Sequence, residues 1–145
     1  MSSFEDLLAQ DGRLVYKTRG RSMEPMLRQD RDLVIIRPPA GRLRRYDTAL
    51  YRRGGNYVLH RVIRDCGDHY LIRGDNTYRL ETVPDAAVIG VLTAFVRKGK
   101  TISADALCYR LYARLWCALF PVRSILRPLA VRAHRLCITV RRSRH

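Results

Sequence analysis

Three short segments contain residue types that could together hydrolyse a peptide bond. They read GRSMEPML at residues 20–27, YVLHRVI at residues 57–63 and IRGDN at residues 72–76. A serine hydroxyl is a weak nucleophile at neutral pH and must lose its proton to a nearby base as it attacks a carbonyl. Taken singly, each segment also has a structural interpretation: a turn or cap serine, a histidine satisfied in a core, and ordinary turn residues.

Together with VPDAAVIG at residues 83–90, these segments resemble a known peptidase superfamily. The order G-x-S-M-x-P-x-L, a basic residue before R-V-I, G-D-N and V-P-x-x-x-V-x-G is similar to the catalytic core of type I signal peptidases and of LexA-type self-cleaving proteins. The resemblance covers about residues 18–96, and four motifs in one order are far more specific than any one of them. It implies a serine endopeptidase with Ser22 as the nucleophile and His60 as its general base.

The resemblance also bears on the identity of the base. In bacterial signal peptidases and LexA-like proteins the base is a lysine, whereas the branch found in the endoplasmic reticulum, archaea and some sporulating bacteria has a histidine. The three lysines of this chain all lie outside the histidine segment: Lys17, Lys98 and Lys100. A Ser22–His60 pair is therefore implied, and a histidine with an ordinary pKa of about 6.5 can accept a proton at pH 7.

A carboxylate on the second ring nitrogen would fix the tautomer of His60 and stabilise the imidazolium. Asp75 in the Gly-Asp-Asn segment is the first candidate for this role, and Glu81 is the second. The endoplasmic reticulum branch uses an aspartate a few residues beyond its Gly-Asp, and that stretch is shortened here. A purely structural role for Asp75, bracing the turn beside the site, is the alternative.

The residues around Ser22 would shape the site for the oxyanion. Signal peptidases often have a serine two residues before the nucleophile that donates a hydrogen bond, but here that position is Gly20, as in LexA-like relatives. The backbone N–H of Ser22 would then carry more of the stabilisation, which is worth about 3–4 kcal/mol per good donor in other enzymes. We expect Met23 to fill the floor of the site and Pro25 to fix the turn after the nucleophile.

A mainly β domain over residues 1–100 must position these groups. Runs rich in Val, Ile, Leu and Tyr predict strands at residues 33–37, 48–52, 57–63, 69–73 and 88–96. The resemblance implies a small antiparallel β-barrel-like core of the signal peptidase and LexA type.

Turn and cap residues punctuate this domain. Gly54-Gly55 and residues 66–68 predict hairpin turns, and the two prolines of residues 38–41 predict a loop. A short helix is expected at residues 3–10, ended by Asp11-Gly12.

Residues 101–145 predict a basic amphipathic helical tail. Apolar residues recur at helical spacing over residues 103–120 and again over residues 122–140, with Pro121 as an interruption between them. No acidic residue follows Asp105. The tail could lie on an anionic membrane surface, or it could be two helices that pack on the β domain with solvated arginines.

The bulk properties of the 145-residue chain limit its chemistry and its location. A net charge of +15 predicts attraction to an anionic partner. No cofactor or metal is expected, because the four cysteines form no CxxC pair and Cys66 with His69 lacks a second ligand pair. No signal peptide and no apolar stretch of about 20 residues is visible. The expected location is the cytoplasm, either free or peripheral at the inner face of the membrane.

Two functions are consistent with these patterns. The first is a signal peptidase-like serine endopeptidase that cleaves a peptide or protein substrate through an acyl-enzyme on Ser22. The alternative is a catalytically inactive binding module with the peptidase fold that associates with anionic membrane or partner surfaces. Nucleic-acid binding ranks third, because too few residues precede Ser22 for a DNA-binding module like that of LexA-like proteins.

Overall fold

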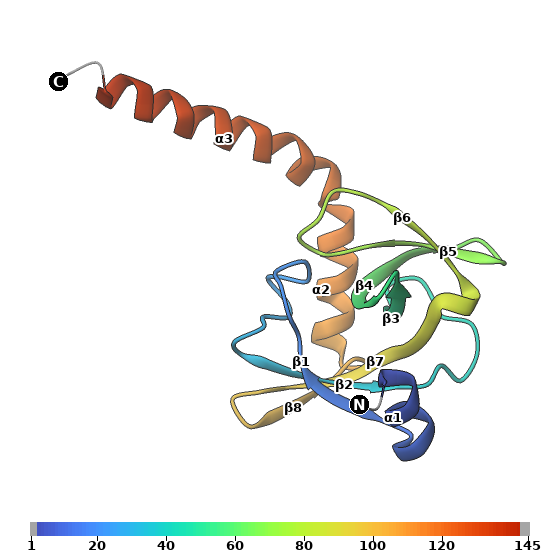
Figure 1. The fold of residues 1–145 in the computed structure, drawn as a ribbon. Coiled ribbons are helices and arrows are strands. Elements are labelled where there is room, and N and C mark those ends of the chain that lie inside the picture. Colours follow the sequence, from blue (N-terminus) through green and yellow to red (C-terminus); the bar gives the residue numbers. More distant parts are fainter. Residues whose placement is uncertain (1–2, 143–145) are drawn as a thin grey trace.

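The chain forms one eight-stranded antiparallel β-sheet, accompanied by three helices (Figure 1). The computed structural model describes the backbone of residues 3–142 and the side chains of residues 3–132. The strands are β1 (Leu14–Lys17), β2 (Asp32–Arg37), β3 (Thr48–Arg53), β4 (Asn56–Asp65), β5 (His69–Arg73), β6 (Glu81–Pro84), β7 (Val88–Arg97) and β8 (Lys100–Ser103). The helices are α1 (Phe4–Asp11), α2 (Leu107–Ala118) and α3 (Phe120–Arg142).

The five strands predicted from apolar runs are confirmed as β2, β3, β4, β5 and β7. The predicted hairpin turns are confirmed too, because β3 pairs with β4 and β4 pairs with β5, in both cases antiparallel. The remaining strands, β1, β6 and β8, were not predicted. Each has only four residues, which is too short for an alternating pattern to stand out from loop sequence.

The expected barrel is not confirmed, because the sheet is open. Its strand order is β1-β2-β7-β3-β4-β5-β6, with β8 added on β7. The two ends of this path, β1 and β6, do not pair with each other among the described residues. The coarser prediction of a mainly antiparallel β domain holds.

The predicted N-terminal helix is confirmed as α1, with both bounds one residue later than expected: Phe4–Asp11 rather than residues 3–10. The Ser3 hydroxyl accepts from the Asp6 N–H at 3.1 Å, and the Asp6 carboxylate accepts from the Ser3 N–H at 2.8 Å. This reciprocal capping box satisfies two N–H groups that a helix start leaves unpaired. At the other end Gly12 has a φ of +65°, the left-handed conformation that glycine adopts without strain.

The two C-terminal helices differ in their bounds from the prediction. The first begins at Leu107 rather than at residue 103, because residues 100–103 form β8. The break between the helices falls at Leu119, and Pro121 lies in the first turn of α3. A proline is tolerated there because the first N–H groups of a helix have no partner within it. The division of the chain at residue 100 stays a prediction, and β8 lies across it.

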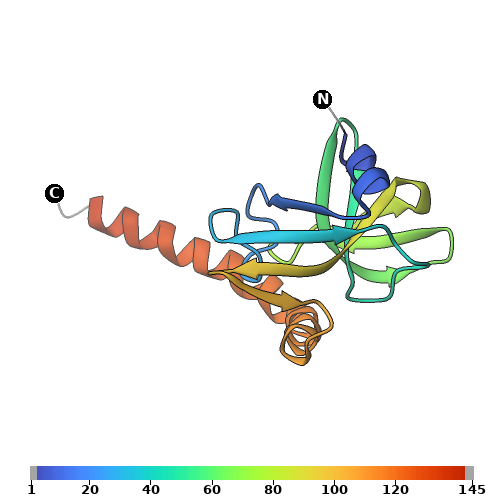
Figure 2. The same ribbon diagram turned by 90° about the horizontal axis from the view of Figure 1, so that it is seen from below.

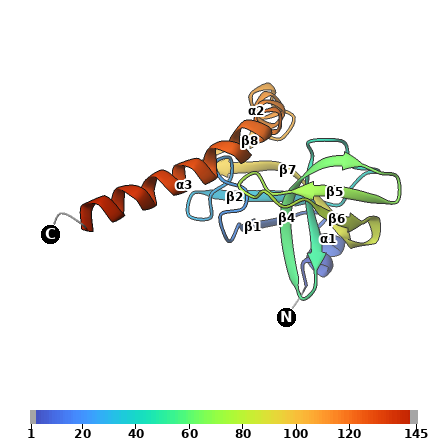
Figure 3. The same cartoon turned by 90° about the horizontal axis from the view of Figure 1, so that it is seen from above.

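Helices α1 and α2 lie on opposite sides of the sheet formed by β1, β2 and β7 (Figures 2 and 3). Helix α2 packs through Tyr109, whose ring lies 5.9 Å from that of Phe95 on β7. The Tyr109 hydroxyl also bonds Thr48 on β3 at 2.9 Å. Helix α3 projects away from the β domain (Figure 1). No helix among the described residues is both long enough and apolar enough to cross a bilayer.

Candidate active site

Ser22 lies in the turn that follows β1, with its side chain half-buried. The chain enters this turn through Gly20, whose φ of +80° suits a residue without a side chain and whose N–H donates to Gln29 Oε1 at 2.8 Å. Met23 is buried in the main core and also lines the cavity at Ser22. Pro25 is exposed in the same turn. Met23 therefore anchors the Ser22 turn to the hydrophobic core.

A second turn, at residues 74–76, clamps Ser22 from the other side. The Asn76 N–H donates to the Ser22 carbonyl at 2.8 Å, and its side-chain amide donates to the Arg21 carbonyl at 3.1 Å. A Cβ atom built on Gly74 would lie 2.6 Å from the Ser22 carbonyl oxygen and 3.1 Å from His60 Nε2. The Ser22 carbonyl and the Nε2 edge of the imidazole therefore both lie against Gly74, and only a glycine leaves room for both.

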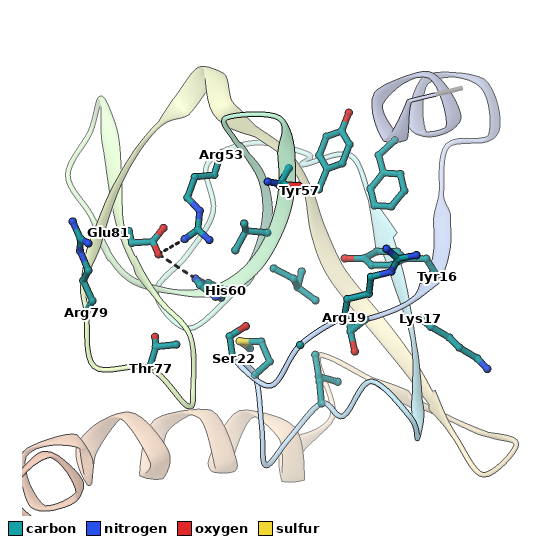
Figure 4. A pocket seen from close by; sticks show the side chains of 18 residues that line it. Tyr16, Lys17, Arg19, Ser22, Arg53, Tyr57, His60, Thr77, Arg79 and Glu81 are labelled. Carbon is teal, nitrogen blue, oxygen red and sulfur yellow. Dashed lines mark hydrogen bonds and ion pairs between the residues drawn. The ribbon is translucent and has the colours of Figure 1, made fainter. Parts of the chain in front are cut away.

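His60 is held on its opposite edge by a tyrosine and a glutamate. It lies on β4 and is buried, and its Nδ1 is 3.1 Å from the hydroxyl of Tyr51 on β3. That hydroxyl donates to Glu81 Oε2 on β6 at 2.7 Å. The other carboxylate oxygen of Glu81 accepts from Arg53 at 2.6 Å and lies 3.9 Å from Nδ1. Figure 4 shows His60 with Glu81 on one side and Ser22 on the other.

The direction of this chain of hydrogen bonds fixes the histidine tautomer. A tyrosine has one hydroxyl hydrogen, and that of Tyr51 is directed at the Glu81 carboxylate, which in its ionised form can only accept. The contact with His60 must therefore run from Nδ1–H to the Tyr51 oxygen. Nε2 is left with a free lone pair on the edge that faces Gly74 and Ser22, so His60 has the tautomer that a general base needs.

The surroundings of His60 also favour its neutral form. Burial lowers the pKa of the imidazole, and the Arg53 charge lowers it further, while the Glu81 carboxylate and, more weakly, Asp75 raise it. The net result is a pKa below the ordinary histidine value. The imidazole is therefore uncharged at neutral pH and can accept a proton.

Asp75 bonds to other partners than His60. Its two carboxylate oxygens each accept from the Arg61 guanidinium at 2.7 Å, and both side chains are buried. One of these oxygens also accepts from Tyr112 on α2 at 3.0 Å. The Asp75 carbonyl accepts from Trp116 at 2.8 Å and from Arg123 at 3.0 Å. These contacts brace the turn at residues 74–76 against β4 and α2.

A cavity of about 1070 Å³ lies beside this arrangement. Its lining includes Ser22, His60 and Glu81. No group among the described residues accepts a hydrogen bond from the Ser22 N–H. Four cationic side chains also line the cavity and are labelled in Figure 4: Lys17, Arg19, Arg53 and Arg79.

The structure thus brings Ser22, His60, Gly20, Met23 and the second-choice acid Glu81 to one cavity. Sequence reasoning missed Tyr51, which joins His60 to Glu81. Strand alternation predicts that Tyr51 is buried but does not show which group its hydroxyl reaches. Among the described side chains, no group of three or more histidine, cysteine, aspartate or glutamate residues is arranged to hold a metal ion.

Comparisons with known proteins add no relative. No protein-family model matches the chain, and a search of curated proteins finds no match. The peptidase resemblance therefore rests on the sequence motifs alone.

The charges around His60 predict two opposite pKa shifts. In Glu81→Gln the carboxylate that favours the imidazolium is lost, so the His60 pKa should fall below the wild-type value. In Arg53→Gln an opposing positive charge is lost, so the pKa should rise. NMR titration of the His60 ring protons measures both, with His60→Gln identifying the signal. An unchanged or higher pKa in Glu81→Gln would mean that Glu81 does not act on this ring.

Proposed function

We propose that this protein is a serine endopeptidase of the signal peptidase-like type, with Ser22 as the nucleophile and His60 as the general base. One observation carries the proposal: Ser22 and His60 line one cavity, and the Ser22 backbone carbonyl and the Nε2 edge of His60 both lie against Gly74. The four motifs in family order support it independently. The same proposal takes the antiparallel β domain as a signal peptidase and LexA-type core.

In the proposed reaction the Ser22 hydroxyl attacks the carbonyl carbon of the scissile peptide while its proton passes to Nε2 of His60. The resulting imidazolium donates from Nδ1 to Tyr51, whose hydroxyl donates to the Glu81 carboxylate. Nε2 then gives its proton to the leaving amine, and the C–N bond breaks to form an ester on Ser22. A water deprotonated by His60 attacks this ester, and the hydroxyl of Ser22 is restored.

The oxyanion of the tetrahedral intermediate needs a donor fixed in advance. The backbone N–H of Ser22 is the donor that we propose, because it has no other acceptor among the described residues. Gly20 cannot supply a side-chain donor, and its N–H is taken by Gln29. The clamp from Asn76 to the Ser22 carbonyl holds this peptide unit in place.

We propose Glu81, rather than Asp75, as the acid that orients His60. Glu81 reaches Nδ1 through the Tyr51 hydroxyl and lies 3.9 Å from this nitrogen itself. Asp75 directs both carboxylate oxygens to Arg61. A buried carboxylate that is fully paired in this way stabilises the turn rather than the imidazolium.

The second candidate function is an inactive module with the same fold that binds an anionic surface. The exposed apolar and arginine side chains of α2 and α3 favour it. These side chains are compatible with an active enzyme as well, because they lie outside the cavity that contains Ser22. We propose a cytoplasmic protein that is peripheral at the inner face of the membrane.

A fluorophosphonate probe, which phosphonylates activated serines with loss of fluoride, tests the catalytic pair. We expect wild-type protein to be labelled on Ser22, Ser22→Ala not at all, and His60→Gln at least about 100-fold more slowly, as expected for loss of a general base. Intact-protein mass spectrometry with peptide mapping measures the adduct. Ser103→Ala and His69→Gln are matched controls outside the cavity and should react like wild type. Absence of labelling and of peptide hydrolysis in wild type would leave the inactive module as the better account.

The close approach at Gly74 makes a separate prediction. In Gly74→Ala the new methyl group would lie 2.6 Å from the Ser22 carbonyl oxygen, so the backbone must shift and Ser22 must move relative to His60. A displacement of about 1 Å can lower a rate by about 100-fold, and we expect a loss of this order in the labelling rate. Gly55→Ala is the control, since nothing lies within 4 Å of its Cβ position. Equal labelling rates in the two variants would contradict this geometry.

A further inference from the structure

The exposed large apolar side chains of this protein are concentrated on α2 and α3. Two of those among the described residues, Val15 and Leu80, lie elsewhere. The others follow one another along the two helices: Leu107, Leu111, Leu115, Leu119, Val122, Ile125, Leu126, Leu129 and Val131. Exposed apolar side chains that follow one another along two consecutive helices point to an interaction site, because isolated exposed leucines are common but long stripes are not.

On α2 the exposed leucines face away from the β-sheet. Tyr109 and Ala113 are buried against the sheet. Leu107, Leu111 and Leu115 recur every fourth residue, which places them on the face opposite to Tyr109 and Ala113. Their exposed fractions are 73%, 50% and 62%. The apolar face of α2 is therefore presented to whatever surrounds the protein and is not part of its own core.

Arginines border the apolar stripe. Arg110 and Arg114 are exposed on α2, one residue before Leu111 and Leu115, and Arg127 and Arg132 are exposed on α3. No aspartate or glutamate occurs after Asp105 to neutralise them. A second copy of the same face would bring these positive charges together, so the occupant must carry negative charge beside its apolar part.

A second cavity, of about 870 Å³, lies on the side of α2 that includes Tyr109 and Ala113, and it is also lined by Arg110 and Arg114, which border the leucine stripe. Its lining includes five arginines and two aspartates: Arg42, Arg44, Arg45, Arg110, Arg114, Asp47 and Asp105. One Asp47 carboxylate oxygen accepts from the Arg44 backbone N–H at 2.8 Å. The excess of positive charge in this hollow suits an anionic headgroup at the border of the leucine stripe.

We propose that α2 and the first turns of α3 dock in the plane of an anionic bilayer. The leucine stripe enters the boundary between headgroups and acyl chains, and the flanking arginines contact the phosphates. Two contributions add up in this binding. Anionic lipids attract the positively charged protein as a whole, and the apolar area that can be buried lies on this face. The proposal is independent of whether Ser22 is a nucleophile.

The opposite face of α2 connects this docking surface with the cavity. Tyr112 and Trp116 donate to Asp75 at 3.0 and 2.8 Å. Asp75 is flanked by Gly74 and Asn76, which contact Ser22. A bilayer bound at α2 would therefore hold the Ser22 cavity at a fixed height and orientation above the lipid surface.

Vesicle binding by the full chain tests the proposal. The probes are vesicles of equal parts phosphatidylcholine and phosphatidylglycerol, compared with pure phosphatidylcholine, in a sedimentation assay at low and physiological salt. We expect binding to the anionic vesicles, and we expect Leu111→Ser/Leu115→Ser to weaken the partition coefficient by at least about tenfold. Val15→Ser/Leu80→Ser removes two exposed apolar side chains outside the stripe and should bind like wild type.

Two double arginine variants distinguish binding through this face from general electrostatic attraction of the whole protein. Arg110→Gln/Arg114→Gln should weaken anionic binding by about tenfold or more. Arg37→Gln/Arg64→Gln lowers the net charge equally on the β domain and should have a smaller effect. Circular dichroism checks that every variant is folded.

Three results would overturn the proposal. The first is no binding to anionic vesicles at low salt, and the second is equal losses in the two arginine variants. The third is a dimer, seen by light scattering, that Leu111→Ser/Leu115→Ser dissociates while vesicle binding is unchanged. In that case a second copy covers the stripe.

Discussion

The buried ion pair between Arg61 and Asp75 joins the three parts of the molecule on which the proposed chemistry depends. Arg61 directly follows His60 on β4, and Asp75 lies in the turn that clamps Ser22. The same carboxylate accepts from Tyr112 and so connects this turn with α2. Removing one partner of such a pair leaves an uncompensated buried charge and typically costs about 3–5 kcal/mol. The pair therefore makes the relative placement of the nucleophile, the base and the helix depend on one contact.

The two nitrogens of the His60 imidazole, next to this pair, have different surroundings. The Nδ1 edge is committed to the Tyr51 hydroxyl and through it to Glu81. The Nε2 edge faces the position where Ser22 passes Gly74. Burial and the Arg53 charge lower the pKa of His60, while Glu81 stabilises the charge that a transferred proton would bring. A base that is neutral at rest and supported once protonated suits proton transfer in both directions.

Much of this arrangement could be predicted from the sequence, and the remainder has physical reasons for being hidden. Long apolar runs revealed the five longer strands, whereas the four-residue strands β1, β6 and β8 carry too little pattern. Whether the sheet closes depends on the pairing of its ends, which composition does not encode. Motif order pointed to Ser22 and His60, but it ranked Asp75 above Glu81. The sequence does not show that Arg61 pairs with the Asp75 carboxylate. Nor does it show that the Tyr51 hydroxyl links Glu81 to His60.

The tautomer of His60 is the property on which the proposed reaction depends most directly. A long-range proton–nitrogen NMR correlation of the ring, recorded in the folded protein above the His60 pKa, identifies which nitrogen carries the hydrogen. The hydrogen-bond chain from Tyr51 to Glu81 predicts a protonated Nδ1 and a bare Nε2. A protonated Nε2 in the resting protein would contradict the account, because that nitrogen could not then take the proton of Ser22.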